Sequence, residues 1–164
     1  MNPHFAKADV LAACETYGPQ LQVPEGLDGA GVMAALSSNE SSVGFDCGPR
    51  HEPAYDLGGS LAVGEQQSLL SQYGATAAAS YGPWQMMFIN FTPEVQSKIA
   101  THGDELIDYA QEFVRWFNRY VIRVRKATNL DQIGQVWNLG HIGPDPVYTS
   151  KLEAAYDGWK AGTL

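Results

Sequence analysis

Residues 28–42 read DGAGVMAALSSNESS, an apolar segment that ends in a run of polar residues. Asp28 is a good N-cap for a helix over residues 29–39, and the apolar residues that follow it favour a largely buried helix. Glu40 then lies in the last turn, near the negative end of the helix dipole and partly removed from water. Both effects disfavour the carboxylate and raise its pKa, as a general acid at neutral pH requires. An ordinary exposed glutamate at a helix end is the alternative.

The other periodic segments are also typical of helices. Apolar side chains in residues 104–126 recur three or four positions apart, which predicts one long helix across the core. These are Leu106, Ala110, Phe113, Phe117, Tyr120 and Val124. Further helices are predicted over residues 5–17, 65–73, 130–138 and 147–159, with another that begins at Pro93 and is capped by Thr92. No segment alternates like a strand, so we expect a mainly α, single domain over residues 1–164.

A long segment without periodicity, residues 41–60, follows the helix that carries Glu40. It is rich in Gly, Pro, Ser and Asp. A loop of this length in a compact domain is usually either functional or disordered. Its chemistry-bearing residues favour function; they are Asp46, Arg50, His51, Glu52, Tyr55 and Asp56.

The composition excludes several classes of protein. Eighteen acidic and ten basic residues give a net charge of −8, which argues against nucleic-acid binding. The one basic cluster is predicted to be a solvated helix face; it comprises Arg115, Arg119, Arg123, Arg125 and Lys126. No apolar run approaches the about 20 residues that span a bilayer, so no membrane partner is expected. The first residues, MNPHFAK, lack the pattern of a signal peptide.

Histidines and cysteines do not form recognisable metal motifs. His4, His51, His102 and His141 lack ligand spacing, which disfavours a zinc amidase, and we expect no metal or organic cofactor. Cys14 and Cys47 are predicted to be two buried free thiols; a disulfide in an oxidising compartment is the alternative.

Four short motifs occur in an order that resembles a known family. They are Glu40-Ser41-Ser42, Arg50-His51-Glu52-Pro53-Ala54-Tyr55, Ser80-Tyr81-Gly82-Pro83-Trp84-Gln85, and Trp137-Asn138-Leu139-Gly140 with Tyr148 after it. Over residues 28–160 the chain resembles the soluble lytic transglycosylases and goose-type lysozymes of the lysozyme-like superfamily, including phage-type muramidases. The resemblance implies a lysozyme-like domain with a cleft and a long loop after the catalytic helix.

The resemblance also implies roles for individual residues. Glu40 would be the catalytic acid, with Ser41 buttressing it or shaping the cleft. Gln85 would face the sugar beside the backbone of Met86 and Met87, and Trp137 and Asn138 would line the opposite wall. Other residues that could line a sugar site are Tyr55, Tyr81, Trp84, Asn90 and Tyr148. Core packing is the alternative for Tyr81 and Trp84, and it is favoured for Phe88, Phe113, Trp116 and Phe117.

The implied activity is cleavage of the β-1,4 bond between N-acetylmuramic acid and N-acetylglucosamine in peptidoglycan. Hydrolysis by inversion needs a second carboxylate, for which Asp46, Glu52 and Asp56 are candidates. Glu52 is the first choice, and its alternative role is a salt bridge with an arginine. A lytic transglycosylase would need only Glu40; Trp137, where that family usually has Tyr, favours a hydrolase.

A third alternative is a non-catalytic module that binds sugar or builds a virion. The expected partner is bacterial peptidoglycan, bound by a monomer. An enzyme of this kind suits a phage or prophage lysin that collects in the host cytoplasm before it reaches the wall, or a virion-associated lysin.

Overall fold

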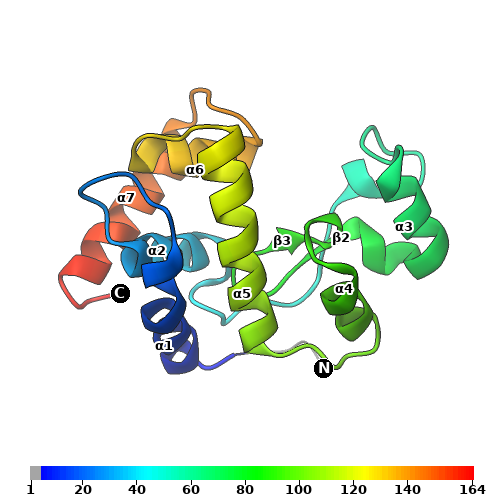
Figure 1. The fold of residues 1–164 in the computed structure, drawn as a ribbon, viewed down its shortest axis with the longest axis horizontal. Coiled ribbons are helices and arrows are strands. Elements are labelled where there is room, and N and C mark those ends of the chain that lie inside the picture. The colour runs from blue at the N-terminus through cyan, green and yellow to red at the C-terminus, as the bar shows by residue number, and fades with distance from the viewer. Residues whose placement is uncertain (1–4) are drawn as a thin grey trace.

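A computed structural model describes residues 5–164, so His4 lies outside the described residues. This part of the chain is mainly helical, as predicted (Figure 1). Its α-helices are α1 (Lys7–Tyr17), α2 (Gly29–Ser41), α3 (Glu65–Tyr73), α4 (Pro93–Ala100), α5 (Leu106–Trp116), α6 (Leu130–Leu139) and α7 (Pro146–Lys160). Short 3-10 turns lie between them: η1 (Gly18–Gln20), η2 (Pro53–Tyr55), η3 (Gly74–Ala78) and η4 (Phe88–Asn90).

Helix α2 is largely buried among the other helices. The side chain of Asp28 accepts hydrogen bonds from the backbone N–H groups of Ala30 and Gly31, at 3.1 and 3.2 Å, which confirms the predicted cap. Helix α7 packs so closely that a Cβ on Gly31 would lie 2.8 Å from the rings of Tyr156 and Trp159. The last helical residue is Ser41, and the C-cap Ser42 has a left-handed φ of 51°. This ending places Glu40 in the last turn.

A small antiparallel sheet, absent from the prediction, begins within the segment after α2, which we call the α2 loop (residues 42–60). Its strands are β1 (Arg50–His51), β2 (Ala79–Tyr81) and β3 (Met86–Met87), in the order β1-β2-β3. Arg50 pairs with Ser80, and Ser80 with Met87. The expectation of no strand was wrong because strands of two or three residues are too short to show alternation. The sheet brings the loop after Glu40 beside the segment that contains Gln85.

The long predicted helix over residues 104–126 is two elements. Helix α5 begins at Leu106, where Glu105 and Asp108 form a capping box, and it continues as the π-helix η5 (Phe117–Val124). Phe113 of α5 is fully buried, and the wider π-turns place Phe117 and Val121 on the same core side, also fully buried, whereas Val124 is 57% exposed. The prediction that Val124 faces the core was therefore wrong.

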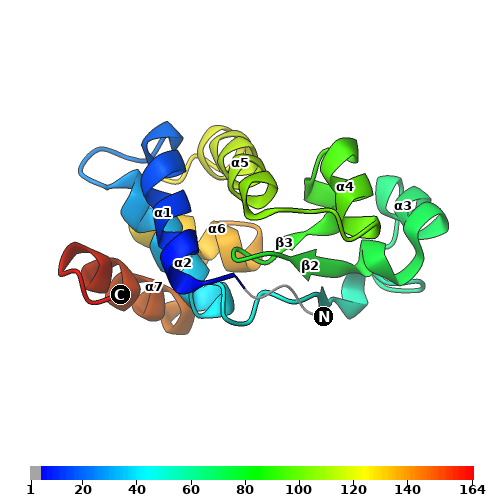
Figure 2. The same ribbon diagram turned by 90° about the horizontal axis from the view of Figure 1, so that it is seen from below.

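The elements gather in two groups. Helices α1, α2, α6 and α7 lie together on one side, the sheet lies with α3 and α4 on the other, and α5 runs between the groups (Figure 2). Cys14 of α1 and Cys47 of the α2 loop are both buried and are not joined by a disulfide. No helix within residues 5–164 is long and apolar enough to cross a membrane.

Candidate active site

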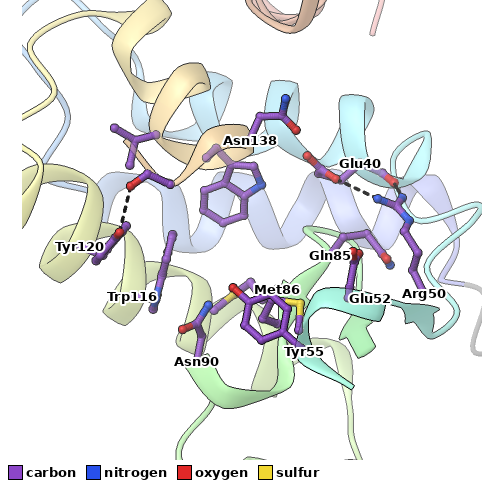
Figure 3. A pocket seen from close by; sticks show the side chains of 14 residues that line it. Glu40, Arg50, Glu52, Tyr55, Gln85, Met86, Asn90, Trp116, Tyr120 and Asn138 are labelled. Carbon is purple, nitrogen blue, oxygen red and sulfur yellow. Dashed lines mark hydrogen bonds and ion pairs between the residues drawn. The ribbon is translucent and has the colours of Figure 1, made fainter. Parts of the chain in front are cut away.

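An open cleft of about 540 Å³ lies between the end of α2 and the sheet (Figure 3). Segments far apart in the sequence build its walls: the end of α2, β1 with η2, the Gln85 turn with β3, the α5–η5 junction and the end of α6. The lining residues are Glu40, Arg50, Glu52, Tyr55, Gln85, Met86, Met87, Asn90, Trp116, Tyr120, Val136, Trp137, Asn138 and Gly140. The structure thus brings residues from all four sequence motifs to one place.

Glu40 projects into this cleft with only 11% of its side chain exposed. The Tyr148 hydroxyl of α7 donates a hydrogen bond to Oε1 at 2.5 Å. Arg50 approaches Oε2 through Nη1 at 3.5 Å, and its Nη2 donates to the Glu40 carbonyl oxygen at 2.8 Å. Three elements therefore fix the position of a single carboxyl group.

The pKa of Glu40 is raised above its ordinary value, chiefly because burial removes the carboxylate from water. The Tyr148 hydrogen bond and the Arg50 charge lower the pKa but do not offset burial, and the negative charge of Glu52 raises it further. Burial raises the pKa of Tyr148 as well, so its hydroxyl stays protonated and remains a donor. Burial therefore favours the protonated form of Glu40 more than in an exposed glutamate, while the Tyr148 hydrogen bond and the Arg50 charge support the carboxylate once the proton is lost.

Glu52 is the second carboxylate of the cleft, and Figure 3 shows it across from Glu40 on the sheet side. The Ser80 hydroxyl donates to Oε1 at 3.3 Å. Within residues 5–164, Oε2 has no hydrogen-bond partner and Glu52 forms no ion pair. The proposed alternative role of Glu52, a salt bridge with Arg50, is not present, because Arg50 pairs with Glu40 instead.

The other two candidate carboxylates lie outside the cleft. Asp46 is exposed. Asp56 accepts from the backbone N–H of Leu57 at 2.7 Å and lies 2.8 Å from Nε2 of His51, and these hydrogen bonds lower its pKa. Of the three residues predicted for this role, only Glu52 lies where it could act with Glu40.

Gln85 lies in the cleft wall as predicted, but its amide is engaged by the protein. Its Oε1 accepts from the Ser80 hydroxyl at 3.0 Å, and its Nε2 donates to the carbonyl oxygens of Gly82 and Gly48 at 3.0 and 3.3 Å. The backbone of Gln85 is left-handed, with φ of 47°. These bonds fasten the turn to the α2 loop, and Ser80 links this network to Glu52.

Trp137 and Asn138 line the side of the cleft opposite the sheet, at the end of α6. Asn138 is oriented by a hydrogen bond from Nδ2 to Asp145 Oδ2 at 2.7 Å. Tyr55, which follows Glu52 in η2, and Asn90 in η4 also lie where the sequence reasoning placed them, along the cleft.

Trp116 and Tyr120 are cleft residues that the sequence reasoning assigned to the core. Their rings stack with centroids 4.8 Å apart, and Trp116 also meets the Trp137 ring edge-on. The Tyr120 hydroxyl donates to the Gly140 carbonyl oxygen and accepts from Arg125. For Tyr120 the α-helical spacing that suggested core packing fails, because the π-helix Phe117–Val124 changes which residues share a face.

Four residues proposed for the site do not line the cleft. One of them, Tyr148, acts on it only through the hydrogen bond to Glu40. Ser41 is buried; its hydroxyl donates to the carbonyl oxygens of Pro83 and Ser37 and accepts from the Gly44 N–H, so it braces the wall. Tyr81 is buried, and its hydroxyl donates to Thr76 O on the far side of the sheet. Trp84 packs in the core with Nε1 donating to Met33 O. The sugar-contact prediction for Tyr81 and Trp84 was therefore wrong.

Replacing Tyr148 by phenylalanine is expected to raise the pKa of Glu40, because the variant removes the hydrogen bond that supports the carboxylate. A carbon-13 NMR titration of the Glu40 carboxyl measures this shift. Tyr55→Phe is the matched control, since Tyr55 lines the same cleft and makes no hydrogen bond to Glu40. An unchanged pKa in Tyr148→Phe would contradict the role assigned to this contact.

Residues 5–164 contain no group of three or more His, Cys, Asp or Glu side chains that could hold a metal ion. No family model, curated protein or solved structure matches this chain. Its function must therefore be argued from the cleft itself.

Proposed function

We propose that the protein is a lysozyme-like muramidase that hydrolyses the β-1,4 bond between N-acetylmuramic acid and N-acetylglucosamine in peptidoglycan. The observation that carries the proposal is the pair of carboxyl groups in one open cleft. Glu40 is buried, with a raised pKa, on one wall, and Glu52 keeps a free oxygen on the other. Glycosidases cleave with such a pair, one protonated and one ionised.

In the proposed mechanism Glu40 gives its proton to the glycosidic oxygen as the bond to the sugar breaks. Glu52 accepts a proton from a water molecule, which attacks the anomeric carbon from the opposite face. The hydrogen bond from Tyr148 and the charge of Arg50 then stabilise the Glu40 carboxylate that remains. A Glu40 that begins neutral and becomes charged during the reaction gains these interactions as the charge develops.

The remainder of the cleft suits a chain of amino sugars. Aromatic rings stack on the apolar faces of sugars, while amides bond to hydroxyl and N-acetyl groups. Tyr55, Trp116, Tyr120 and Trp137 supply rings, and Asn90 and Asn138 supply amides. The glycan of peptidoglycan presents both kinds of surface.

The second candidate function is a lytic transglycosylase with the same acid. The contacts of Tyr148 and Arg50 with Glu40 favour it, because a well-supported Glu40 carboxylate could take the proton of the muramyl 6-hydroxyl and close a 1,6-anhydro ring. This route gives Glu52 no proton to accept.

Mass spectrometry of the muropeptides released from purified peptidoglycan tests the proposal. A muramidase is expected to release fragments with reducing muramic acid ends. Fragments lighter by one water, with 1,6-anhydro ends, would establish the lytic route instead. Binding to peptidoglycan without release of fragments from any of several wall types would overturn both and favour a non-catalytic binding module.

A further inference from the structure

A second hollow of about 510 Å³ continues the cleft beyond the end that Figure 3 shows farthest from Arg50. It shares Asn90, Trp116 and Tyr120 with the cleft, so the two hollows meet along the stacked Trp116–Tyr120 pair. A polymer that crosses this pair of rings would enter both hollows. The second hollow has its own set of charged side chains, which are Glu65, Arg115 and Arg119.

Arg119 is the unneutralised cation of this second hollow. It is exposed, and within residues 5–164 it has neither a hydrogen bond nor an ion pair. Its neighbour Arg115 is fully engaged: it pairs with Glu112 at 2.6 Å and donates to the Asn90 carbonyl oxygen. Glu112 also accepts from Thr92, whose hydroxyl therefore makes this bond instead of the predicted helix cap.

The other walls of the hollow limit what could bind there. Glu65, at the start of α3, brings an exposed carboxylate to the same hollow. Apolar side chains from Ile89, Pro93 and Val124 also line it. The hollow therefore suits a ligand with a carboxylate, an ammonium group and a short aliphatic part. An uncharged run of N-acetylglucosamine needs none of these charged partners.

We propose that this hollow binds the stem peptide of peptidoglycan, with Arg119 holding a peptide carboxylate and Glu65 holding the free amino group of a diamino acid. The proposal rests on the function proposed above, since the glycan in the cleft brings the peptide to the hollow. A guanidinium binds a carboxylate through two parallel hydrogen bonds, which gives both strength and orientation. In a protein of net charge −8, a free arginine beside the cleft attracts anions locally against an unfavourable overall charge.

The test compares two substrates: intact peptidoglycan freed of wall phosphate polymers, and glycan strands freed of peptides by an amidase. Arg119→Gln is expected to raise KM on intact peptidoglycan roughly tenfold, as loss of a charge-assisted hydrogen bond would. Arg119→Lys is expected to recover part of that loss. On bare glycan strands the difference from the wild type should disappear. Arg123→Gln is the matched control, because Arg123 is exposed on the same helix but lies outside the hollow.

Three results would overturn the proposal. Equal KM values for Arg119→Gln and the wild type on intact peptidoglycan would exclude a peptide contact. An equal loss on both substrates would assign Arg119 to the glycan instead. A higher KM of Arg119→Gln seen only when wall phosphate polymers are retained would show that Arg119 binds phosphate and not a peptide carboxylate.

A binding measurement separates this proposal from the function on which it rests. If the wild type cleaves neither substrate, the muramidase proposal fails, and calorimetric titration with a free stem tripeptide that ends in a diamino acid still tests the hollow. Weaker binding by Arg119→Gln and by Glu65→Gln, but not by Arg123→Gln, would support the peptide site alone. Identical binding by all of these proteins would overturn it.

Discussion

Glu40→Gln is expected to bind peptidoglycan as the wild type does and to cleave it about 10³-fold more slowly, within the range that loss of a general acid produces. Glutamine has the same shape and can still accept the Tyr148 hydrogen bond, but it has no proton to give to the leaving oxygen. Release of reducing ends measures kcat, and co-sedimentation with insoluble peptidoglycan measures binding. Glu153→Gln, an exposed glutamate on α7, is the matched control. A variant that kept a tenth of the wild-type kcat would show that Glu40 is not the acid.

The same variant should be more stable than the wild type above neutral pH. Because burial raises the pKa of Glu40, the folded protein binds this proton more tightly than the unfolded chain does. The resulting stability is fully present below the ordinary glutamate pKa of about 4.3 and is lost as pH rises through the raised value. Glutamine does not ionise, so the advantage in Tm of Glu40→Gln should grow with pH across this window. Thermal unfolding at several pH values measures it.

Local signals were enough to predict most of the helices and the position of Glu40 at the end of α2. The bounds of α3 match the prediction, because a glycine ends the helix at Gly74, and Asp28 caps α2 as its position suggested. The end of α2 puts Glu40 in a desolvated last turn, and burial is the largest cause of its raised pKa. These features depend on residues close together in the sequence, where capping and helix-stop rules apply.

The contacts that complete the cleft could not be predicted in the same way. Tyr148 was one of several expected lining residues, but its bond to Glu40 joins positions 108 residues apart and depends on how α7 packs against α2. Trp116, the last residue of α5, and Tyr120, in the π-helix, stack on each other and line the cleft, although both were expected in the core. Tyr81 and Trp84 lie in a motif expected to face sugar, yet both large rings are buried in the core.

Two carboxyl groups in one cleft can take different roles because their surroundings differ. Glu40 is buried beside Tyr148 and pays a desolvation penalty when it ionises, so it favours the proton-bound form. Among the described residues the Glu52 carboxyl group has one hydrogen-bond partner, the Ser80 hydroxyl, which leaves its second oxygen without one. The negative charge of Glu52 also raises the pKa of Glu40. An ionised Glu52 therefore helps Glu40 to hold its proton.

Glu52→Gln is expected to lower the rate of hydrolysis about 10²-fold or more while binding is kept, because the variant cannot accept a proton from the attacking water. It should also lower the pKa of Glu40, since it removes a nearby negative charge. The alkaline limb of the profile of kcat against pH is then expected to move to lower pH. Tyr148→Phe should move it the opposite way. Steady-state kinetics across pH on purified peptidoglycan measures both effects.

Asp56→Asn is the matched control for Glu52→Gln, because Asp56 belongs to the same loop but bonds to His51 and the Leu57 N–H outside the cleft. Its products and rates should match those of the wild type. A Glu52→Gln variant that kept the wild-type rate and released only 1,6-anhydro ends would remove Glu52 from the chemistry and assign the lytic route to Glu40 alone. A lower rate of hydrolysis by Glu52→Gln, together with opposite shifts of the alkaline limb in Glu52→Gln and Tyr148→Phe, would support a joint action of Glu40 and Glu52 on one glycosidic bond.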